Sequence, residues 1–302
     1  LFLLTPKANR MKRGKSRRLF KKKKSHSNQR LGCIIAIIVL IPICYGLYLY
    51  YQQYSVQHSS KPQIETSVSL PTPSGKDLEI PVSLIPRQEQ IIRHKGYTVS
   101  YNKDLKIPNW VSYELTREGT KGKEKRGDNF IADPLVKGAI ATNADYARSG
   151  YDKGHMAPAA DMKWSPDVMK ESFYFSNMCP QHPQLNRRGW KNLEEKIRDW
   201  AVADSAIIII CGPIIDKPSK TIGKNKVAVP ERFFKVILSP FVKPARGIGF
   251  LFNNRQAVEP LSTYAVSIDS IEKLTHMDFF SPLPDEIENA VEANADYYQW
   301  AR

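Results

Sequence analysis

Four polar residues in the middle of the chain have types and a spacing that could support acid–base or metal chemistry. His155 ends the motif Asp-Lys-Gly-His, and Asn186, Glu194 and Arg198 follow it, with eight residues from the Asn to the Glu and four from the Glu to the Arg. An imidazole has the intrinsic pKa of a base near neutral pH. An amide oxygen is a hard ligand that suits Mg²⁺. On its own, however, the His motif is compatible with a catalytic group, a metal ligand or a residue that closes a turn.

The segment that carries the last three of these residues has the pattern of an amphipathic helix, and we predict a helix over residues 186–201. At about 100° per residue, its apolar residues form one stripe that should be buried; they are Trp190, Leu193, Ile197 and Trp200. Asn186 lies at the start of the helix in line with the stripe, while Glu194 and Arg198 lie at its margin. The simplest interpretation of this i,i+4 pair is an exposed ion pair that contributes about 0.3–0.5 kcal/mol. The alternative is a polar margin that faces a cleft.

The remaining patterns predict a domain of mixed β and α structure. A second helix should begin at Ser165-Pro166-Asp167, with a cap, a proline in the first turn and an acid beside it, and end near Ser172. The run AIIIICG at 206–212 predicts a central strand that is buried on both faces. Further strands are expected at 97–101, 110–115, 233–238 and 247–252. Because strands and helices do not alternate, a doubly wound parallel sheet is not expected.

Two segments together carry a resemblance to a known family. DKGH at Asp152–His155 is followed by FYFSNMCPQHPQLNRRGWKNLEEKIR at 173–198. These motifs resemble the nonspecific DNA/RNA endonucleases that include endonuclease G, and the similarity extends from about residue 85 to about residue 285. The resemblance implies an α+β fold: a ββα-metal (His-Me finger) core with a mixed, largely antiparallel sheet flanked by helices.

The resemblance also implies a role for each site residue in the hydrolysis of a phosphodiester. His155 is the expected general base, and Asn186 is the expected direct ligand of a metal ion, Mg²⁺ with Mn²⁺ as the second candidate. Glu194 is expected to orient waters around that ion, and Arg198 and Arg126 to contact phosphate. Hydrolysis needs such a base, a cation for the charge that grows on the phosphoryl oxygens, and assistance to the leaving 3′ oxygen.

Two positions fit the family pattern less closely. Lys153 stands where the family usually has Arg, and this change keeps the positive charge but loses the bidentate fork. Arg126, in KRGDNFIADP, is the best match to the upstream phosphate-binding Arg, because a basic residue precedes an aromatic residue and an Asp-Pro pair.

The cysteine and histidine residues allow other interpretations. His155, Cys179 and His182 could form a zinc site, although Cys-Pro-Gln-His is not a usual ligand spacing. His182, His94 and His276 are more simply surface or loop residues. Cys179 and Cys211 could form a disulfide outside the cytoplasm, or Cys211 could be a buried free thiol within its apolar strand.

The N-terminal third predicts a membrane anchor. Residues 1–30 contain 12 of the 45 Lys and Arg and no Asp or Glu, and Leu31–Tyr51 contain no charge at all. At about 1.5 Å per residue, the second segment forms a helix of roughly 30 Å, which is the thickness of a bilayer core. We therefore expect a single transmembrane helix at 31–51, a linker at 52–77 and the nuclease domain at 78–302. A cleaved signal peptide is the alternative for 31–51, and a nucleic-acid or nuclear-localisation patch is the alternative for the basic tail.

Charge sets the expected topology and constrains the substrate. The basic tail should stay in the cytoplasm, which places the domain on the periplasmic or extracellular side. Met11 is a candidate for the true first residue. Beyond residue 30 the chain has 33 basic and 30 acidic residues, so we expect turnover at a local basic cleft and not tight binding over a broad surface. DNA and RNA are the expected substrates; a non-catalytic nucleic-acid-binding protein and a small-phosphodiester hydrolase are the alternatives.

Overall fold

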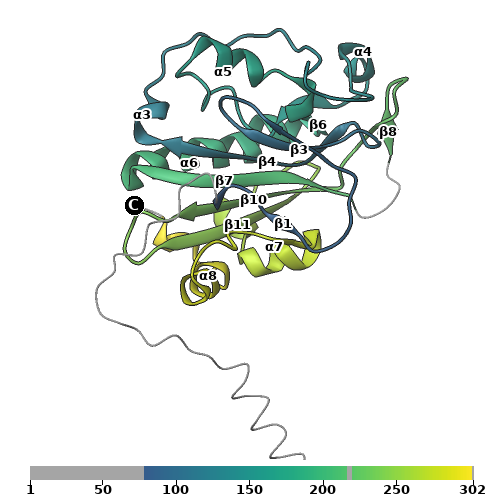
Figure 1. Ribbon diagram of the computed structural model, residues 1–302. Helices are drawn as coiled ribbons and strands as arrows, with labels where there is room; N and C mark the ends of the chain where they lie inside the picture. Colours follow the sequence, from purple (N-terminus) through teal and green to yellow (C-terminus); the bar gives the residue numbers. More distant parts are fainter. Residues whose placement is uncertain (1–77, 216–219, 301–302) are drawn as a thin grey trace, which may run out of the picture. The chain divides into compact units, whose positions relative to one another are not determined.

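A seven-stranded antiparallel sheet forms the centre of the chain (Figure 1). The computed structural model describes residues 78–215 and 220–300. The strand order is β12-β11-β10-β7-β4-β3-β2, and β7 lies in the middle. The strands are β2 (Gln90–Arg93), β3 (Thr98–Asn102), β4 (Ile107–Thr116), β7 (Ala206–Ile214), β10 (Arg232–Ser239), β11 (Arg246–Asn253) and β12 (Ala265–Val266).

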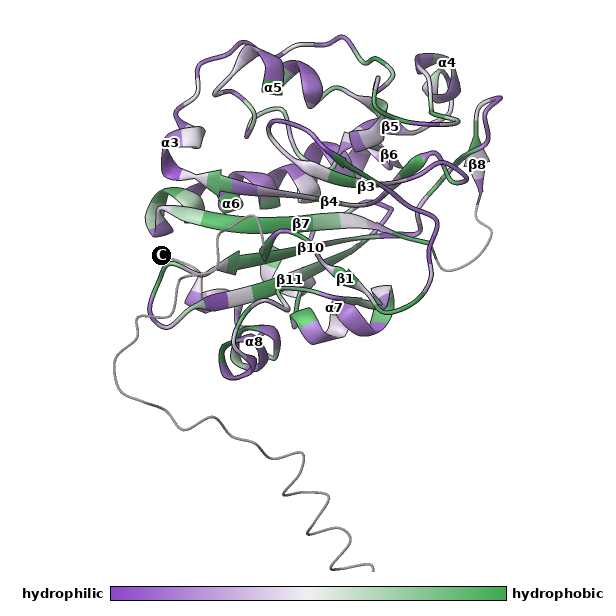
Figure 2. Ribbon diagram, in the orientation of Figure 1, coloured by the Kyte–Doolittle hydropathy of each residue, from purple (hydrophilic) through white to green (hydrophobic). Residues whose placement is uncertain are grey.

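The sheet is apolar on both faces, and β7 shows why. Alternate side chains of a strand point to opposite faces. Ile207, Ile209 and Cys211 belong to one buried cluster, whereas Ile208 and Ile210 belong to another. All of β7 is buried, and most of its length is hydrophobic (Figure 2). The continuous apolar run thus forms the central, doubly covered strand that the sequence predicted.

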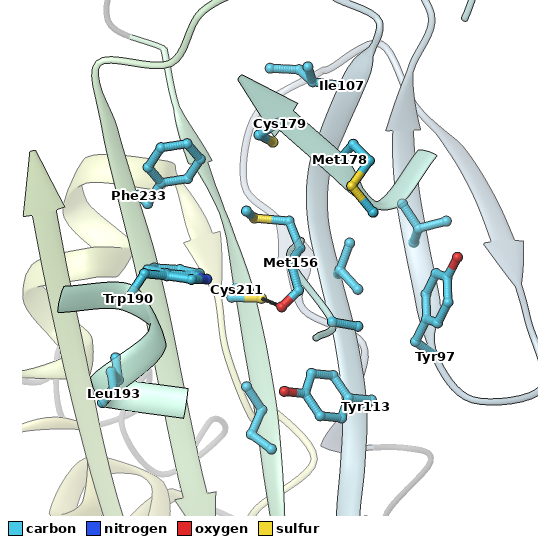
Figure 3. Packing of buried hydrophobic residues seen from close by; sticks show 14 of the residues in the cluster. Tyr97, Ile107, Tyr113, Met156, Met178, Cys179, Trp190, Leu193, Cys211 and Phe233 are labelled. Carbon is cyan, nitrogen blue, oxygen red and sulfur yellow. Dashed lines mark hydrogen bonds between the residues drawn. The ribbon is translucent and has the colours of Figure 1, made fainter. Parts of the chain in front are cut away.

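Helix α6 (Lys191–Asp204) covers the face that carries Ile207, Ile209 and Cys211. Helices α7 (Ile268–Thr275) and α8 (Asp285–Glu292) cover the opposite face (Figure 1). The predicted apolar stripe of α6 is buried against the sheet, with Trp190 1 % and Ile197 0 % exposed. Figure 3 shows Trp190 and Leu193 in the same cluster as Phe233, Met156 and Cys211. This packing fixes the helix that carries Glu194 and Arg198.

Small strand pairs and short helices complete the fold. The pairs are β1 (Val82–Ser83) with β13 (Met277–Asp278), β5 (Asp152–His155) with β6 (Met178–Gln181), and β8 (Thr221–Ile222) with β9 (Val227–Ala228). The remaining helices are α3 (Arg117–Thr120), α4 (Asn143–Tyr146) and α5 (Pro166–Glu171), the 3₁₀ turns η1 (Phe175–Asn177), η3 (Leu261–Tyr264) and η4 (Tyr297–Gln299), and the π-helical turn η2 (Leu185–Trp190).

The α+β class is confirmed, with two refinements. All paired strands in the described sheets are antiparallel, and parallel pairing is limited to an isolated bridge between Ile131 and Tyr174. The predicted helix at 186–201 begins as the π-helical turn η2 before it continues as α6.

The predicted tail, anchor and linker at 1–30, 31–51 and 52–77 lie outside the described residues. Among the helices of residues 78–215 and 220–300, none has the length and apolar character needed to cross a membrane.

Candidate active site

A two-stranded ribbon followed by a helix frames the site. β5 pairs with β6, so that His155 lies opposite Met178 and Gly154 opposite Cys179. A Cβ atom on Gly154 would lie 2.3 Å from Oε1 and 2.6 Å from Cβ of Gln181. Only glycine therefore lets the two strands approach this closely. The ribbon leads into η2 and α6, as in the ββα arrangement that the resemblance implied.

One pocket of about 330 Å³ is lined by every residue that the sequence singled out for the site. Those residues come from three separate parts of the chain: the 122–141 loop, the β5 strand and the η2–α6 helix. They are Arg126, Lys153, His155, Asn186, Glu194 and Arg198. Sequence spacing alone could predict that Asn186, Glu194 and Arg198 lie near one another on a helix. It could not predict that the fold brings the β5 strand and the 122–141 loop to the same side of that helix.

His155 is held between aromatic rings at the back of the pocket. It is 7 % exposed, and its ring meets Phe173 edge to face at 5.1 Å and Phe130 at 5.6 Å between centroids. The indole of Trp190 donates a hydrogen bond to the His155 carbonyl oxygen at 3.3 Å. Within the described residues, the buried Nε2 atom has no hydrogen-bond partner. Burial, and then the charges of Arg126 and Lys153, lower the pKa of His155 to about 3, so the imidazole is neutral at physiological pH.

Asp152 orients the amide of Asn186, a function that the sequence analysis missed. The Asn186 amide nitrogen donates to Oδ2 of Asp152 at 2.9 Å. Arg187 holds the same carboxylate with two hydrogen bonds, at 2.8 Å and 2.7 Å. Because the nitrogen is engaged, the amide oxygen of Asn186 is left available to a cation. The signal for this contact was present in the sequence, since Asp152 is the first residue of the His motif.

Glu194 and Arg198 do not form the simple surface ion pair that their spacing suggested. Arg198 donates instead to the buried carboxylate of Asp161 at 2.8 Å, and the Tyr113 hydroxyl donates to the other oxygen of that carboxylate at 2.9 Å. Burial, with a contribution from Asp161, raises the pKa of Glu194 to about 7, although Lys235 and Arg198 act in the opposite direction. Asp161 is 37 residues from Arg198 in sequence, so helical spacing could not reveal it.

Lys235 is a second residue that the sequence analysis missed. It is fully buried on β10, its ammonium lies 4.3 Å from the centroid of the Trp190 ring, and it has no hydrogen-bond partner among the described residues. A buried ammonium is costly unless other charges or aromatic faces stabilise it. Glu194 and Asp161 supply such charges. The signal was a single Lys within the apolar run FFKVIL.

Arg126 and Lys153 add positive charge at the pocket mouth, where aromatic rings position both side chains. The Arg126 guanidinium lies 5.4 Å from the Phe173 ring centroid, and the Lys153 ammonium lies 4.1 Å from that of Phe130. Lys153 also donates to the side-chain oxygen of Asn143 at 2.8 Å. The pocket therefore combines a neutral imidazole, an available amide oxygen and several cations, which suits an anionic ligand.

Comparison with known proteins identifies the family. The sequence pattern of the DNA/RNA non-specific endonucleases matches residues 74–286. This chain belongs to that family. It is 30 % identical over 250 residues to a nuclease of Nostoc sp., which covers 78 % of this chain and 88 % of the relative. It is 34 % identical over 213 residues to bovine mitochondrial endonuclease G, which covers 65 % and 70 %.

A solved structure agrees with this assignment. The chain superposes with a TM-score of 0.62 on a structure titled as the EndoG/EndoGI complex and the mechanism of EndoG inhibition, with 29 % identity, covering 66 % of this chain and 89 % of the other. The chain is a DNA/RNA non-specific endonuclease, that is, a phosphodiesterase. The alternative of a non-catalytic binding protein is not retained.

The structure of this endonuclease also decides the interpretations left open for its cysteines. Cys179 and Cys211 are buried free thiols, and Cys211 donates to the Met156 carbonyl oxygen at 3.2 Å (Figure 3). The disulfide alternative is therefore wrong. No clustered ligand set found in the described residues contains His155, Cys179 or His182, so the structure gives the zinc alternative no support.

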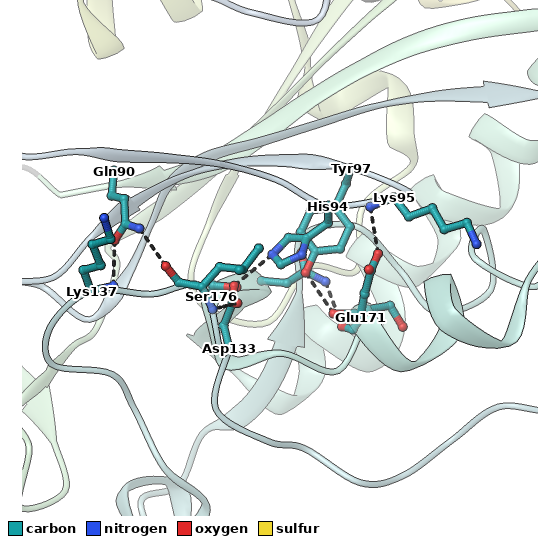
Figure 4. Close-up of polar contacts among 11 residues, drawn as sticks. Gln90, His94, Lys95, Tyr97, Asp133, Lys137, Glu171 and Ser176 are labelled. Atoms are coloured by element: carbon teal, nitrogen blue, oxygen red, sulfur yellow. Dashed lines mark hydrogen bonds and ion pairs between the residues drawn. The ribbon is translucent and has the colours of Figure 1, made fainter.

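His94 was expected on the surface or in a loop, and it lies in the loop between β2 and β3, but its side chain is buried. The imidazole is only 2 % exposed and pairs with Asp133 at 2.8 Å (Figure 4). Ser176 donates to the same Asp133 oxygen at 2.5 Å. The network joins the β2–β3 loop to the loop after residue 130 and to η1, and none of its three residues lines the pocket. His276, by contrast, is exposed after α7.

Proposed function

We propose that this endonuclease hydrolyses phosphodiester bonds of DNA and RNA without preference for sequence or sugar, with a metal ion at Asn186 and His155 as general base. The observation that carries the proposal is the convergence of the six candidate residues on one pocket. A site built from a metal ion, an imidazole and cations recognises the phosphate backbone, which is the same in every sequence.

The residues in the pocket fit a divalent cation. The Asn186 amide oxygen is directed by the hydrogen bond from its nitrogen to Asp152, and Glu194 lines the same pocket. Mg²⁺ commonly binds through few protein oxygens and keeps several waters. When bound, the ion would supply a positive charge that stabilises the negative charge of the transition state. Asn186 would hold it directly, and Glu194 would orient waters around it; Mn²⁺ is the second candidate.

His155 is the group in the pocket best suited to take a proton from the attacking water. It is neutral because burial and the nearby cations keep its pKa near 3, and among residues 78–215 and 220–300 its Nε2 atom has no partner that would compete for the proton. A base with so low a pKa is weak. An anionic phosphodiester would offset the charges of Arg126 and Lys153, so substrate binding itself would raise the pKa of His155.

The cations of the pocket would hold the substrate. Arg198 and Arg126 would donate hydrogen bonds to phosphate oxygens, and such bonds are stronger when both groups are charged. Lys153 would add a point charge in place of the fork that an Arg provides.

The compartment is a separate part of the proposal and is supported by the sequence alone. The uncharged segment 31–51 would anchor the protein, and the 12 basic residues before it would keep the N-terminus in the cytoplasm. The nuclease domain would then act on periplasmic or extracellular nucleic acid. Protease added to spheroplasts should remove the domain, whereas the basic tail should become accessible only after lysis. Protection of the domain from this protease would contradict the topology.

The activity is tested with the full chain purified in a mild detergent. Plasmid DNA and a structured RNA are incubated with the chain in Mg²⁺, with and without EDTA. We expect both substrates to be cleaved, EDTA to stop cleavage, and His155→Ala to lower the rate by about 10²–10⁴-fold. His276→Ala, which changes an exposed His outside the pocket, is the matched control. Cleavage that is indifferent to EDTA and to His155→Ala would refute the proposal, and faster turnover of a small chromogenic diester than of DNA would change its substrate.

A further inference from the structure

Five carboxylates gather on the sheet face opposite the nuclease pocket. This is the face that α7 and α8 cover (Figure 1). They come from α7, β13 and α8, and we refer to them as the carboxylate corner: Asp269, Glu272, Asp278, Glu288 and Glu292. Asp269, Glu272 and Glu292 have carboxylate oxygens within 4.8 Å of one another, and so do Asp278, Glu288 and Glu292. Glu292 is thus common to two sets of three ligands.

Within the carboxylate corner, Glu292 is the buried carboxyl group whose charge no neighbouring cation or hydrogen-bond donor offsets in the described structure. It is only 6 % exposed, and its buried Oε1 atom has no hydrogen-bond partner in the described structure. It is also the last residue of α8, where the negative end of the helix dipole disfavours an anion. Glu288 lies one turn earlier on the same helix, so that two like charges are neighbours.

The neighbours of Glu292 further disfavour its ionised form. Burial, followed by the charges of Glu272, Glu288, Asp278 and Asp269, raises the pKa of Glu292 to about 9. A buried carboxyl group that lacks a partner normally costs stability, and a bound metal ion is a recurrent reason for its presence.

We propose that the carboxylate corner binds a Ca²⁺ ion. Ca²⁺ takes six to eight oxygen ligands at about 2.3–2.6 Å, in flexible geometry, whereas Mg²⁺ demands about 2.0–2.1 Å and a near-ideal octahedron. Ligand atoms that lie within 4.8 Å of one another can share one ion, and the several carboxylates on different elements suit the higher coordination number and flexible geometry of Ca²⁺. The ion sits against Glu292 with one of the two pairs of neighbouring carboxylates, and water completes its ligands.

The ion would link α8 to α7 or to β13. Asp269 and Glu272 lie on α7, Asp278 lies on β13, and Glu288 and Glu292 lie on α8. β13 pairs in turn with β1, where Val82 lies opposite Asp278. Ca²⁺ therefore stabilises the layer that covers the second face of the sheet. This role does not depend on the proposed function of the nuclease pocket.

Ca²⁺ binding is measured on the full chain carrying Asn186→Ala, which removes the proposed ligand in the nuclease pocket. The chain is freed of metal with EDTA, dialysed, and titrated with CaCl₂ by calorimetry and by thermal unfolding followed through Trp fluorescence. We expect one tight Ca²⁺ per chain and a Tm increase of roughly 5–10 °C at a concentration about 100 times Kd. MgCl₂ at the same concentration should give a smaller increase.

Four further variants decide where the ion binds. In the Asn186→Ala background, Glu292→Gln should abolish the Tm increase, whereas Glu286→Gln, an exposed acid on the same helix, should retain it. If Glu292→Gln does not fold, the half-buried pair Asp269→Asn and Asp278→Asn replaces it, and Ca²⁺ affinity should fall at least tenfold in one of the two. No Ca²⁺ effect on Asn186→Ala, or an equal effect in Glu292→Gln, overturns the proposal. With Asn186 intact, Glu292→Gln should still cleave DNA in Mg²⁺, which separates this outcome from a failure of the proposed function.

Discussion

At the residue scale, the properties of the pocket depend on interactions between its charged side chains and its imidazole. Glu194 shares a buried region with Asp161, Arg198 and Lys235, and His155 faces Arg126 and Lys153. Sequence spacing located most of these groups because the family motif is local. It could not identify Asp161 or Lys235, because both residues are far from the helix in sequence and approach it only in the folded structure.

Lys235 should control the protonation of Glu194. Its charge opposes the increase in the pKa of Glu194, so Lys235→Met should raise that pKa further. If ionised Glu194 is needed for cleavage, the acidic limb of the pH profile of kcat/KM should shift to higher pH. The measurement is the profile from pH 5 to 9, with Lys196→Met, an exposed lysine on α6, as control. An unchanged acidic limb would show that Lys235 has only a packing role.

Lys153 should contribute through its charge. A hydrogen bond to a charged group contributes about 1.5–3 kcal/mol, which corresponds to roughly 10–100-fold in rate. Lys153→Met should therefore lower kcat/KM by about that factor and raise the pKa of His155, because one of the cations that lower it is removed. Lys153→Arg should keep most of the activity. The checks are steady-state kinetics and an NMR titration of the His155 ring, and equal activity of the Met and Arg variants would contradict this account.

At the element scale, hydrophobic periodicity located the main strands and both predicted helices to within a few residues. β7 was recognisable because its apolar run is continuous, and α6 because four apolar residues share one stripe. The π-helical turn over Leu185–Trp190 was not predicted, since its residues continue the same apolar pattern. The loop that carries Arg126 has no periodicity, so only the family resemblance pointed to that residue.

The site depends on the close approach of strands β5 and β6. Gly154→Ala should place a methyl group against Gln181 and cost about 1–3 kcal/mol in the free energy of unfolding. Because the strand also carries His155, cleavage should weaken as well. Urea unfolding measures the loss, and Gly127→Ala, whose methyl group would make only ordinary contacts with Phe173, provides the control. Equal stability of the two variants would show that the ribbon adapts without cost.

At the scale of the whole molecule, the sheet separates two regions with opposite charge. The nuclease pocket, with Arg126, Lys153 and Arg198, lies on the α6 face, and the carboxylate corner lies on the α7–α8 face. Overall charge does not reveal this division, because the basic and acidic residues beyond residue 30 nearly balance. Only the fold shows that the excess of positive charge is local.

The salt dependence of binding should therefore be modest. With about three phosphate contacts in the pocket, the slope of log K against log salt should be near −3 for double-stranded DNA and lower for single strands. It is measured with the His155→Ala variant of residues 78–302, so that the basic tail does not contribute. A slope of about −8 or steeper would indicate a broad binding surface and not a local pocket.

The central claim is that Asn186 and His155 perform different tasks at one phosphodiester, and the most direct measurement is a crystal structure of the His155→Ala chain with Mg²⁺ and a short oligonucleotide. The account predicts an ion about 2.0–2.1 Å from the Asn186 amide oxygen, with the scissile phosphate beside it, near Arg126 and Arg198, and space for a water where the imidazole was. An ion bound away from Asn186, or a phosphate that lies outside this pocket, would contradict it.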